Sequence, residues 1–297
     1  MIKTKRTTAD TIYDSVTTLI LILILLIVAY PLYFILTASI SDPNQVRLGK
    51  TLLTPSDPTL DGYGQIFKST IIWRGYRNTV FYTIAGTFLN VTVTILTGYA
   101  LSRKHLKGRN FIMGYFVFTM FFGGGLIPLY ILVNNLHIYN TVWVMILLGV
   151  LSVHNMIICR TFFSSTIPNE LLESAFIDGA GHGRTFFRIV LPLSTAIIAV
   201  MAVYYMVGHW NAYFNALIYL SNSRLYPLQL VLRNILIENE QLQVSDIADA
   251  IERRARERYA DLIKYGLIVV SSAPMLIAYQ FMQKYFIKGV MIGSLKG

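Results

Sequence analysis

Long apolar runs, separated by shorter polar segments, set the pattern of hydrophobic and polar positions along this chain of 297 residues. Each run reaches the roughly 20 residues that an α-helix needs to cross a bilayer. None has Asp, Glu, Lys or Arg in its middle, in keeping with the cost of placing charge in lipid. Because an isolated strand leaves backbone groups unsatisfied in lipid, we predict an all-α integral membrane protein with six transmembrane helices in one domain, residues 1–297. The six runs cover residues 16–40, 79–101, 111–133, 141–163, 193–220 and 262–286.

Composition supports this class. Hydrophobic residues make up 55% of the chain and charged residues only 13%, whereas a soluble domain carries about 25% charged residues. The first apolar run is longer than the ~7–15 residues of a signal peptide, so we expect an uncleaved first helix. The single cysteine, Cys159, allows no internal disulfide and no thiolate metal site, and we expect it to be buried and inert.

The positions of Lys and Arg predict the orientation. Both termini and the segments around residues 103–109 and 160–188 hold 13 of the 25 basic residues against five acids. The segments 41–78 and 221–261, together with Lys264, hold the other 12 basic residues against ten acids. Because positive charge favours the cytoplasmic side, we predict that both termini are cytoplasmic and that these two long loops face outward.

One polar, glycine-rich stretch, residues 167–192 with the sequence IPNELLESAFIDGAGHGRTFFRIVLP, interrupts the apolar pattern without being a simple turn. Pro168 suits the first position of a helix, and clustered glycines beginning at Gly179 would end that helix and turn the chain. A second short helix can run from Arg184 to Leu191, before Pro192 kinks the entry into the next apolar run. We therefore expect a helical hairpin at the membrane surface. Its first helix carries one apolar stripe, formed by Leu171, Leu172, Ala175 and Phe176.

This stretch resembles the EAA loop of ABC-importer permeases, with its pattern Glu-Ala-Ala, then Asp-Gly-Ala, and later Phe, Ile and Leu-Pro. The matching residues are Glu173, Ala175, Asp178, Gly179, Ala180, Phe186, Ile189, Leu191 and Pro192. Ser174 stands where the pattern has Ala, a change that should leave the helix intact. In that family the hairpin is the coupling helix that docks into the cytoplasmic ATPase; the plainer alternative is a glycine-rich cytoplasmic loop. The resemblance implies ATPase coupling by Glu170, Leu171, Leu172, Glu173, Ala175, Phe176, Asp178, Gly179 and Ala180.

Polar and aromatic groups inside two of the apolar runs are candidates for solute contact. The fifth run contains Trp210, Asn211, Tyr213 and Asn215, and the third contains three successive glycines centred on Gly124. Flat aromatic faces with amide hydrogen bonds suit a sugar, and successive glycines weaken a helix. The alternative stays open, since Trp and Tyr gather at membrane interfaces and Asn joins packed helices. His154 and His209 fit packing roles better than a metal site, so we expect no metal ligands.

The outer loops contribute one predicted helix and exclude one motif. Gly49-Lys50-Thr51 lacks the earlier glycine of a phosphate-binding loop, where Asn44 stands, so any ATP chemistry must come from another chain. In the second outer loop, Ser245 can cap a helix that reaches about Tyr259. This helix is either solvated on the outer face or a docking surface for an extracellular binding protein.

Over its full length the chain looks like the second permease of maltose-type carbohydrate importers, with a type I ABC importer permease fold. Residues 121–130 (FFGGGLIPLY) and 259–279 look closer to the branch that imports complex oligosaccharides, including uronates such as alginate oligosaccharides. The resemblance implies a bacterial inner-membrane heterodimer with a homologous permease, two ATP-binding subunits and a solute-binding protein. It also implies that the tail 284–297, which we expect to be poorly ordered alone, threads into the ATPase dimer.

No enzymatic role is expected of this chain. By the same resemblance it holds no cofactor, because ATP and Mg would be bound by the partner subunits. We find no nucleic-acid motif, and no catalytic cluster of carboxylates, His or Cys for an integral-membrane enzyme. The alternative function is a permease of the same fold that carries a non-sugar solute, because fold does not determine substrate.

Overall fold

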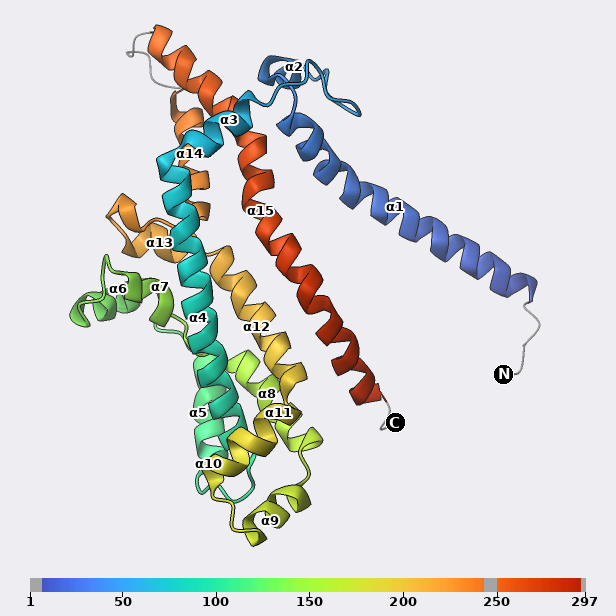
Figure 1. Cartoon of the computed structure of the whole chain (residues 1–297), viewed down its shortest axis with the longest axis vertical. Coiled ribbons are helices and arrows are strands. Elements are labelled where there is room, and N and C mark those ends of the chain that lie inside the picture. The colour runs from blue at the N-terminus through green and yellow to red at the C-terminus, as the bar shows by residue number, and fades with distance from the viewer. Residues whose placement is uncertain (1–6, 243–249, 295–297) are drawn as a thin grey trace. The chain divides into compact units, whose positions relative to one another are not determined.

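The computed structural model describes residues 7–242 and 250–294, and within these ranges every regular element is a helix (Figure 1). The chain forms two compact units. One consists of Met1–Ser69 and Asn234–Ser272, and the other of Thr70–Arg233 and Ala273–Gly297. We call them unit 1 and unit 2.

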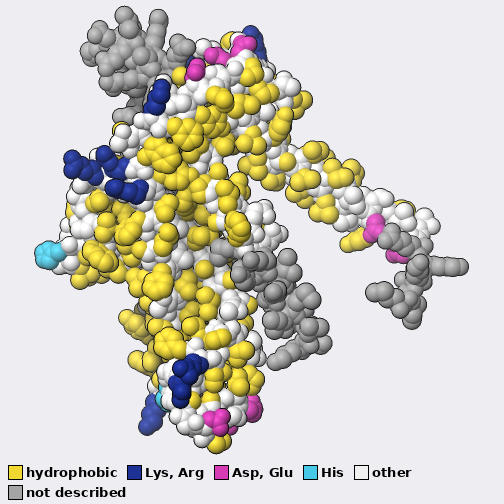
Figure 2. Space-filling model, in the orientation of Figure 1, with side chains coloured by type: hydrophobic (Ala, Val, Ile, Leu, Met, Phe, Trp, Pro, Cys, Tyr) yellow, Lys and Arg dark blue, Asp and Glu magenta, His cyan; other side chains and the backbone are white. Residues whose placement is uncertain are grey.

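Unit 1 begins with the long apolar helix α1, Thr8–Ser39, which lies on the first predicted run. A capping box starts it: the Thr7 hydroxyl accepts from the Asp10 amide while the Asp10 carboxylate accepts from the Thr7 amide. The apolar side chains of α1 are exposed over most of its length, and Figure 2 shows them covering the helix. Such a helix fits a lipid environment and contributes little to a core of its own.

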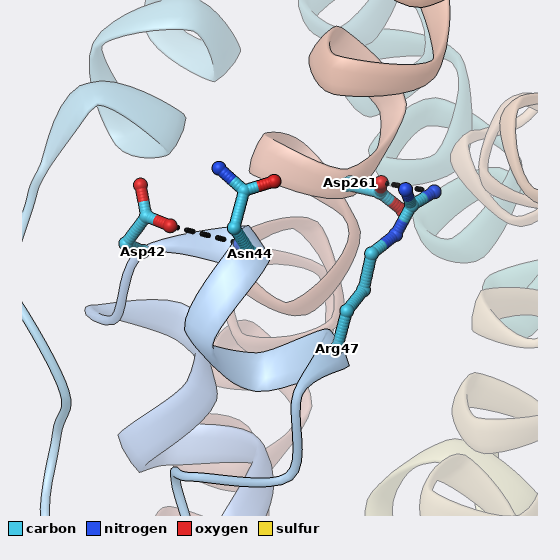
Figure 3. A network of polar contacts seen from close by, with 4 residues as sticks. All are labelled: Asp42, Asn44, Arg47 and Asp261. Carbon is cyan, nitrogen blue, oxygen red and sulfur yellow. Dashed lines mark hydrogen bonds and ion pairs between the residues drawn. The ribbon is translucent and has the colours of Figure 1, made fainter.

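The segment between α1 and α4, predicted as the first outer loop, is ordered by two short helices and a polar network. These are α2, Pro43–Arg47, and α3, Asp61–Lys68. The Asp42 carboxylate accepts from the Asn44 amide at 2.8 Å and so caps α2. At the other end of α2, Arg47 forms an ion pair with Asp261 of helix α15, with 2.6 Å between Nη2 and Oδ2 (Figure 3). Helix α2 and its loop are therefore anchored to α15.

Unit 2 is organised along α4, Thr70–Ser102, against which α8 and α12 pack (Figure 1). Its other elements follow in chain order as α5 Arg109–Phe121, α6 Leu126–Asn135, α7 Val142–Leu147, α8 Val153–Thr166, α9 Asn169–Ile177, α10 His182–Thr185, the π-helix η1 Phe186–Val190, α11 Leu191–Leu193, α12 Thr195–Trp210, α13 Phe214–Tyr219 and the 3₁₀ helix η2 Ser223–Leu225. Helices α14, Leu228–Leu242, and α15, Ala250–Ser294, have residues in both units.

Three of the six predicted runs are interrupted rather than continuous. The third bends by 116° between α5 and α6, at the glycines that end in Gly125, whose φ of +86° is left-handed. The fourth breaks between α7 and α8, and the fifth between α12 and α13. Within the described residues, three helices are long and apolar enough to cross a membrane, or five if each strongly bent pair counts as one span.

Polar side chains of α4 satisfy the backbone where the neighbouring helices break. Asn90 donates from Nδ2 to the Gly149 carbonyl at 3.3 Å, inside the α7–α8 break. Thr94 shares a 2.7 Å hydrogen bond with the Tyr205 hydroxyl, which also accepts from the Ser152 amide. Irregular backbone at membrane depth is tolerated only where protein groups supply such partners. The buried polar row on α4 therefore explains why an apolar run can break here.

The C-terminal helix differs from the prediction in two ways. Helix α15 runs without interruption from Ala250 to Ser294, so the predicted outer helix and the last apolar run form one helix from Ala250 onward. The predicted cap, Ser245, lies outside the described residues. The tail 284–297, expected to be poorly ordered alone, continues the helix as far as Ser294, the last described residue, because the apolar and helix-favouring residues before it propagate the helix.

Close packing of α4 against α8 depends on Gly98. A Cβ atom at this position would lie 2.7 Å from the Cβ of Cys159 and 3.2 Å from the Arg160 amide nitrogen. Cys159 is fully buried at this contact, as predicted from its apolar surroundings. Neither opposing atom is the far end of a flexible side chain, so a larger residue would push the helices apart.

We therefore expect Gly98→Ala to destabilise unit 2 by roughly 1–3 kcal/mol, the usual cost of overpacking. Gly114→Ala is the matched control, because a Cβ added there, inside α5, would meet no atom within 4 Å. Thermal unfolding of the two purified variants in detergent provides the measurement. Equal melting temperatures would show that the α4–α8 contact relaxes without cost.

Candidate functional site

The glycine-rich stretch forms the predicted helical hairpin at one end of unit 2 (Figure 1). Pro168, expected as the first helical residue, is instead the N-cap with ψ of 142°, so α9 begins one residue later. Ser174, which departs from the family pattern, donates its hydroxyl to the Glu170 carbonyl at 2.9 Å. Its polar group is thus satisfied within the helix, and α9 stays intact as expected.

The apolar stripe of α9 divides between two faces. Leu172 and Ala175 are buried, with Leu172 only 5% exposed. Leu171 and Phe176 are 37% and 40% exposed, and Ile177 is 87% exposed. Leu172 belongs to a group that we call the hairpin core. Its members are Phe163, Ile167, Leu172, Phe186 and Val190.

This division corrects the prediction that Leu172 lies on a face open to a partner. Leu171 and Leu172 point about 100° apart on the helix, and only Leu172 turns into the hairpin core. The outward apolar surface consists instead of Leu171, Phe176 and Ile177. Ile177 was missed by the sequence analysis, although it stands four residues after Glu173 and next to Phe176, at the exposed end of α9.

Charged groups surround this outward surface. Glu170, Glu173 and Asp178 are exposed on α9 and its C-cap, and Figure 2 shows acidic side chains at this end of unit 2. No ion pair joins these three acids to any residue in the described ranges. Arg184 and Arg188, in the second arm of the hairpin, are exposed as well. The surface thus offers apolar side chains rimmed by acids and bases.

A Schellman turn fixes the angle between the two arms. The Ala180 amide donates to the Ala175 carbonyl at 2.9 Å, and the Gly179 amide donates to the Phe176 carbonyl at 3.0 Å. Gly179 has a φ of +78°, which a residue with a side chain rarely adopts. The ring of Phe176 also packs edge-on against His182 at 4.8 Å between centroids. Gly179 and Ala180 therefore shape the hairpin through their backbone.

The second arm of the hairpin joins α12 through a sharp bend in the helix axis. The π-helix η1 precedes Pro192, which has no N–H to donate, and the axis turns by 78° between the segments His182–Leu193 and Thr195–Trp210. At the bend the Ser194 amide bonds to the Leu191 carbonyl, while the buried Ser194 hydroxyl donates to the Val190 carbonyl at 2.7 Å. The bend thus lies two residues after the predicted kink, and Ser194 compensates the helical bond lost there.

The candidate solute residues lie at the other end of α12. Trp210 ends α12 and is only 5% exposed, with its ring edge-on to Tyr76 of α4 at 5.9 Å. Asn211 and Tyr213 follow in the α12–α13 break and are exposed, and Asn215 is half-buried in α13. The break thus brings these four residues together. Gly124 lies apart from them in sequence, exposed in the α5–α6 bend.

His209, one residue before Trp210, packs its ring directly against Gly86 of α4, where a Cβ atom would collide with it. Its Nε2 is buried and has no hydrogen-bond partner within the part of the chain described. Glycine at position 86 is therefore what lets α12 approach α4 near the candidate solute residues.

We expect Gly179→Ala to strain the turn by about 1–2 kcal/mol, because alanine must adopt the left-handed conformation. Gly183→Ala is the matched control: its φ is not left-handed and its surroundings are equally open. Hydrogen exchange of the α9 amides should be faster in Gly179→Ala than in Gly183→Ala. Identical exchange in the two variants would mean that the turn does not depend on this backbone shape.

The chain matches the family described as "Binding-protein-dependent transport system inner membrane component" over residues 90–291. It is 38% identical over 277 residues to the polygalacturonan/rhamnogalacturonan transport system permease protein YtcP of Bacillus subtilis (strain 168), covering 93% of this chain and 96% of that protein. It is 36% identical over 267 residues to Protein LplC of the same organism, covering 90% of this chain and 89% of the relative.

A solved structure agrees with the sequence relatives. It is the crystal structure of a bacterial ABC transporter involved in the import of the acidic polysaccharide alginate, one chain of which superposes with a TM-score of 0.86. The superposition covers 96% of this chain and 100% of that chain, at 26% sequence identity. The all-helical fold is therefore the type I ABC permease fold, and the chain belongs to the family of binding-protein-dependent transport system inner membrane components.

Proposed function

We propose that this chain is the transmembrane permease subunit of an ATP-driven, binding-protein-dependent carbohydrate importer, and that α9 couples it to an ATPase. The observation that carries the coupling role is the outward surface of α9. Leu171, Phe176 and Ile177 remain exposed among acids, while the opposite face of the same helix is fixed in the hairpin core. Apolar anchors surrounded by a polar rim are the usual form of a protein-binding surface.

The proposed assembly contains a second, homologous permease, two ATP-binding subunits and an extracytoplasmic solute-binding protein. ATP and Mg would be bound by the ATPase subunits alone. The excess of basic residues on the hairpin side supports an inner-membrane orientation in which both termini and α9 face the cytoplasm. In this arrangement six spans cross the membrane, three of them as the interrupted helices of unit 2.

The proposed substrate is an oligosaccharide that contains uronate. Two similar proteins support this class: one is named for polygalacturonan and rhamnogalacturonan transport, and the other takes part in alginate import. The candidate contacts remain Trp210, Asn211, Tyr213, Asn215 and Gly124. Because Trp210 is enclosed against Tyr76, it would contact the sugar only by its edge or after α12 shifts.

The geometry suggests how ATP could act on the sugar site. Helix α12 has 16 residues and spans roughly 24 Å from the Ser194 bend to Trp210. A displacement of α9 would reach the bend through the hairpin core, and α12 would carry it to the candidate solute residues. Coupling of this kind requires two arrangements of the helices whose balance both ligands bias. The bend and the breaks are places where such rearrangement is possible.

The test uses the complete complex in vesicles, with ATP hydrolysis measured as the binding protein is loaded with oligogalacturonate, alginate oligosaccharide, maltodextrin or an amino-acid mixture. We expect stimulation by a uronate oligosaccharide. Glu173→Arg and Ile177→Asp should lower ATPase association at least tenfold, because interface anchors contribute roughly 2 kcal/mol or more, and stimulation should be lost. Both residues are exposed, so the permease itself should still insert and fold.

Two controls accompany these variants. Ile177→Val keeps an apolar group at the same site, and Leu106→Asp adds a charge to another loop, between α4 and α5. Both should retain stimulation. Full stimulation in Glu173→Arg and Ile177→Asp would refute the docking role of α9, and stimulation by amino acids alone would assign a non-sugar substrate.

A further inference from the structure

The C-terminal ends of α4 and α8 are joined by two arginines, each reaching across to the other helix. Arg103, just after α4, donates from Nη2 to the Phe163 carbonyl at 2.8 Å. Arg160, on α8, donates from Nε to the Leu101 carbonyl at 3.2 Å. Both acceptors lie in the last turn of their helices, where carbonyls lack helical partners and the dipole favours a cation. Each helix end is thus capped by the other helix.

Arg103 also connects to the hairpin through an aromatic group. Its guanidinium carbon lies 5.0 Å from the ring centroid of Tyr99, and its Nε donates to the Ser102 hydroxyl at 2.8 Å. The Tyr99 ring packs edge-on against Phe163 at 5.5 Å and obliquely against Phe186 at 5.0 Å. Phe186 is the first residue of η1, in the second arm of the hairpin. One arginine therefore holds a ring that contacts both α8 and the hairpin.

These contacts continue into α9. Phe163 and Phe186 are buried in the hairpin core together with Leu172, the inward residue of α9. Close-packed cores transmit displacement because they contain few voids that could absorb it. A movement of α9 would therefore reach Tyr99 and α4 as well as the Ser194 bend. Helix α4 also carries Asn90 and Thr94, which support the α7–α8 break, so this path continues from the hairpin to that break.

The contacts at position 103 require an arginine side chain, because a positive charge alone would not make all of them. Burial lowers the pKa of its guanidinium from the ordinary value, with Tyr99 partly opposing this, and the group stays charged. Nη1 is buried and has no hydrogen-bond partner in the described part of the chain. Lysine could not make the same planar set of contacts to a carbonyl, a hydroxyl and a ring at once.

We propose that Arg103, acting through Tyr99, is a positioning residue that fastens the coupling hairpin to α4 and so transmits hairpin movement into the helix bundle. The proposal rests on the proposed function of α9. It predicts that weakening this link uncouples ATP hydrolysis from the binding protein while docking of the ATPase persists. A purely structural role would instead reduce all activities of the complex together.

The experiment compares basal ATP hydrolysis with hydrolysis stimulated by sugar-loaded binding protein, using assembled complexes in vesicles. In Arg103→Lys we expect normal ATPase co-purification, a near-normal basal rate and a ratio of stimulated to basal rate that falls roughly fivefold or more. Lys104→Met, a change at the exposed neighbouring residue, is the matched control and should keep the wild-type ratio. A wild-type ratio in Arg103→Lys, or an equal fall in both rates, would overturn the proposal.

A second pair of variants decides the matter if Arg103→Lys does not assemble. Tyr99→Phe keeps the ring and should keep the ratio, whereas Tyr99→Leu removes it and should lower the ratio. Equal ratios in the two variants would count against the link. If the wild-type complex itself shows no stimulation, the proposed function fails and this inference with it. If the wild type is stimulated and the Arg103 and Tyr99 variants are stimulated to the same extent, the proposed function stands and only this inference fails.

Discussion

The need to satisfy backbone groups inside an apolar bundle governs the architecture of unit 2. Three of its apolar runs break, and each break exposes N–H and C=O groups that lipid cannot satisfy. At the α7–α8 break, Asn90 of α4 and Tyr205 of α12 supply the missing partners. The buried polar residues of α4 therefore do more than join helices: they provide hydrogen-bond partners for the irregular backbone between α7 and α8. Close approach at Gly86 and Gly98 brings α12 and α8 near enough for these bonds.

The same helix connects the hairpin end of unit 2 with the end that holds the candidate solute residues. At one end, α4 meets the hairpin core through Tyr99, and at the other, Tyr76 packs against Trp210 beside the candidate solute residues. Helix α12 connects the same two ends by a separate path, through the Ser194 bend. The hairpin between these paths packs directly against the bundle. Its inward face is held by packing and its turn by Gly179.

Features that neighbouring residues determine could be predicted from the sequence, whereas features that depend on residues distant in the chain could not. The long helices α1 and α4 follow from continuous apolar runs, and the first helix of the hairpin begins within one residue of the prediction because caps and glycines act locally. The break at residues 148–152 could not be foreseen, since the groups that stabilise it lie on α4 and α12. The orientation of Leu172 was missed for a similar reason. An apolar stripe shows which residues avoid water but not which of them meet their own chain.

The candidate solute residues show the same limit. Trp210 and Asn211 are neighbours in sequence, yet one is enclosed and the other exposed, because the helix ends between them. The sequence signals for Ile177 and Ser194 were weak. Ile177 is an apolar residue just before Asp-Gly, and Ser194 is a serine just after Leu-Pro-Leu. Arg103 gave none, because its role arises from the carbonyl and rings that α8 and the hairpin bring to it. Functional geometry of this kind depends on tertiary contacts.

The most direct test of the central claim is a cross-link from the outward surface of α9 in the assembled complex. The chain would carry Cys159→Ala, so that Ile177→Cys is its sole thiol, and a short thiol-to-amine reagent would be added. We predict a covalent product that contains this chain and an ATPase subunit, and no such product from Asp57→Cys in the first outer loop. Failure of Ile177→Cys to cross-link in a complex that still hydrolyses ATP, or equal cross-linking from Asp57→Cys, would contradict the account.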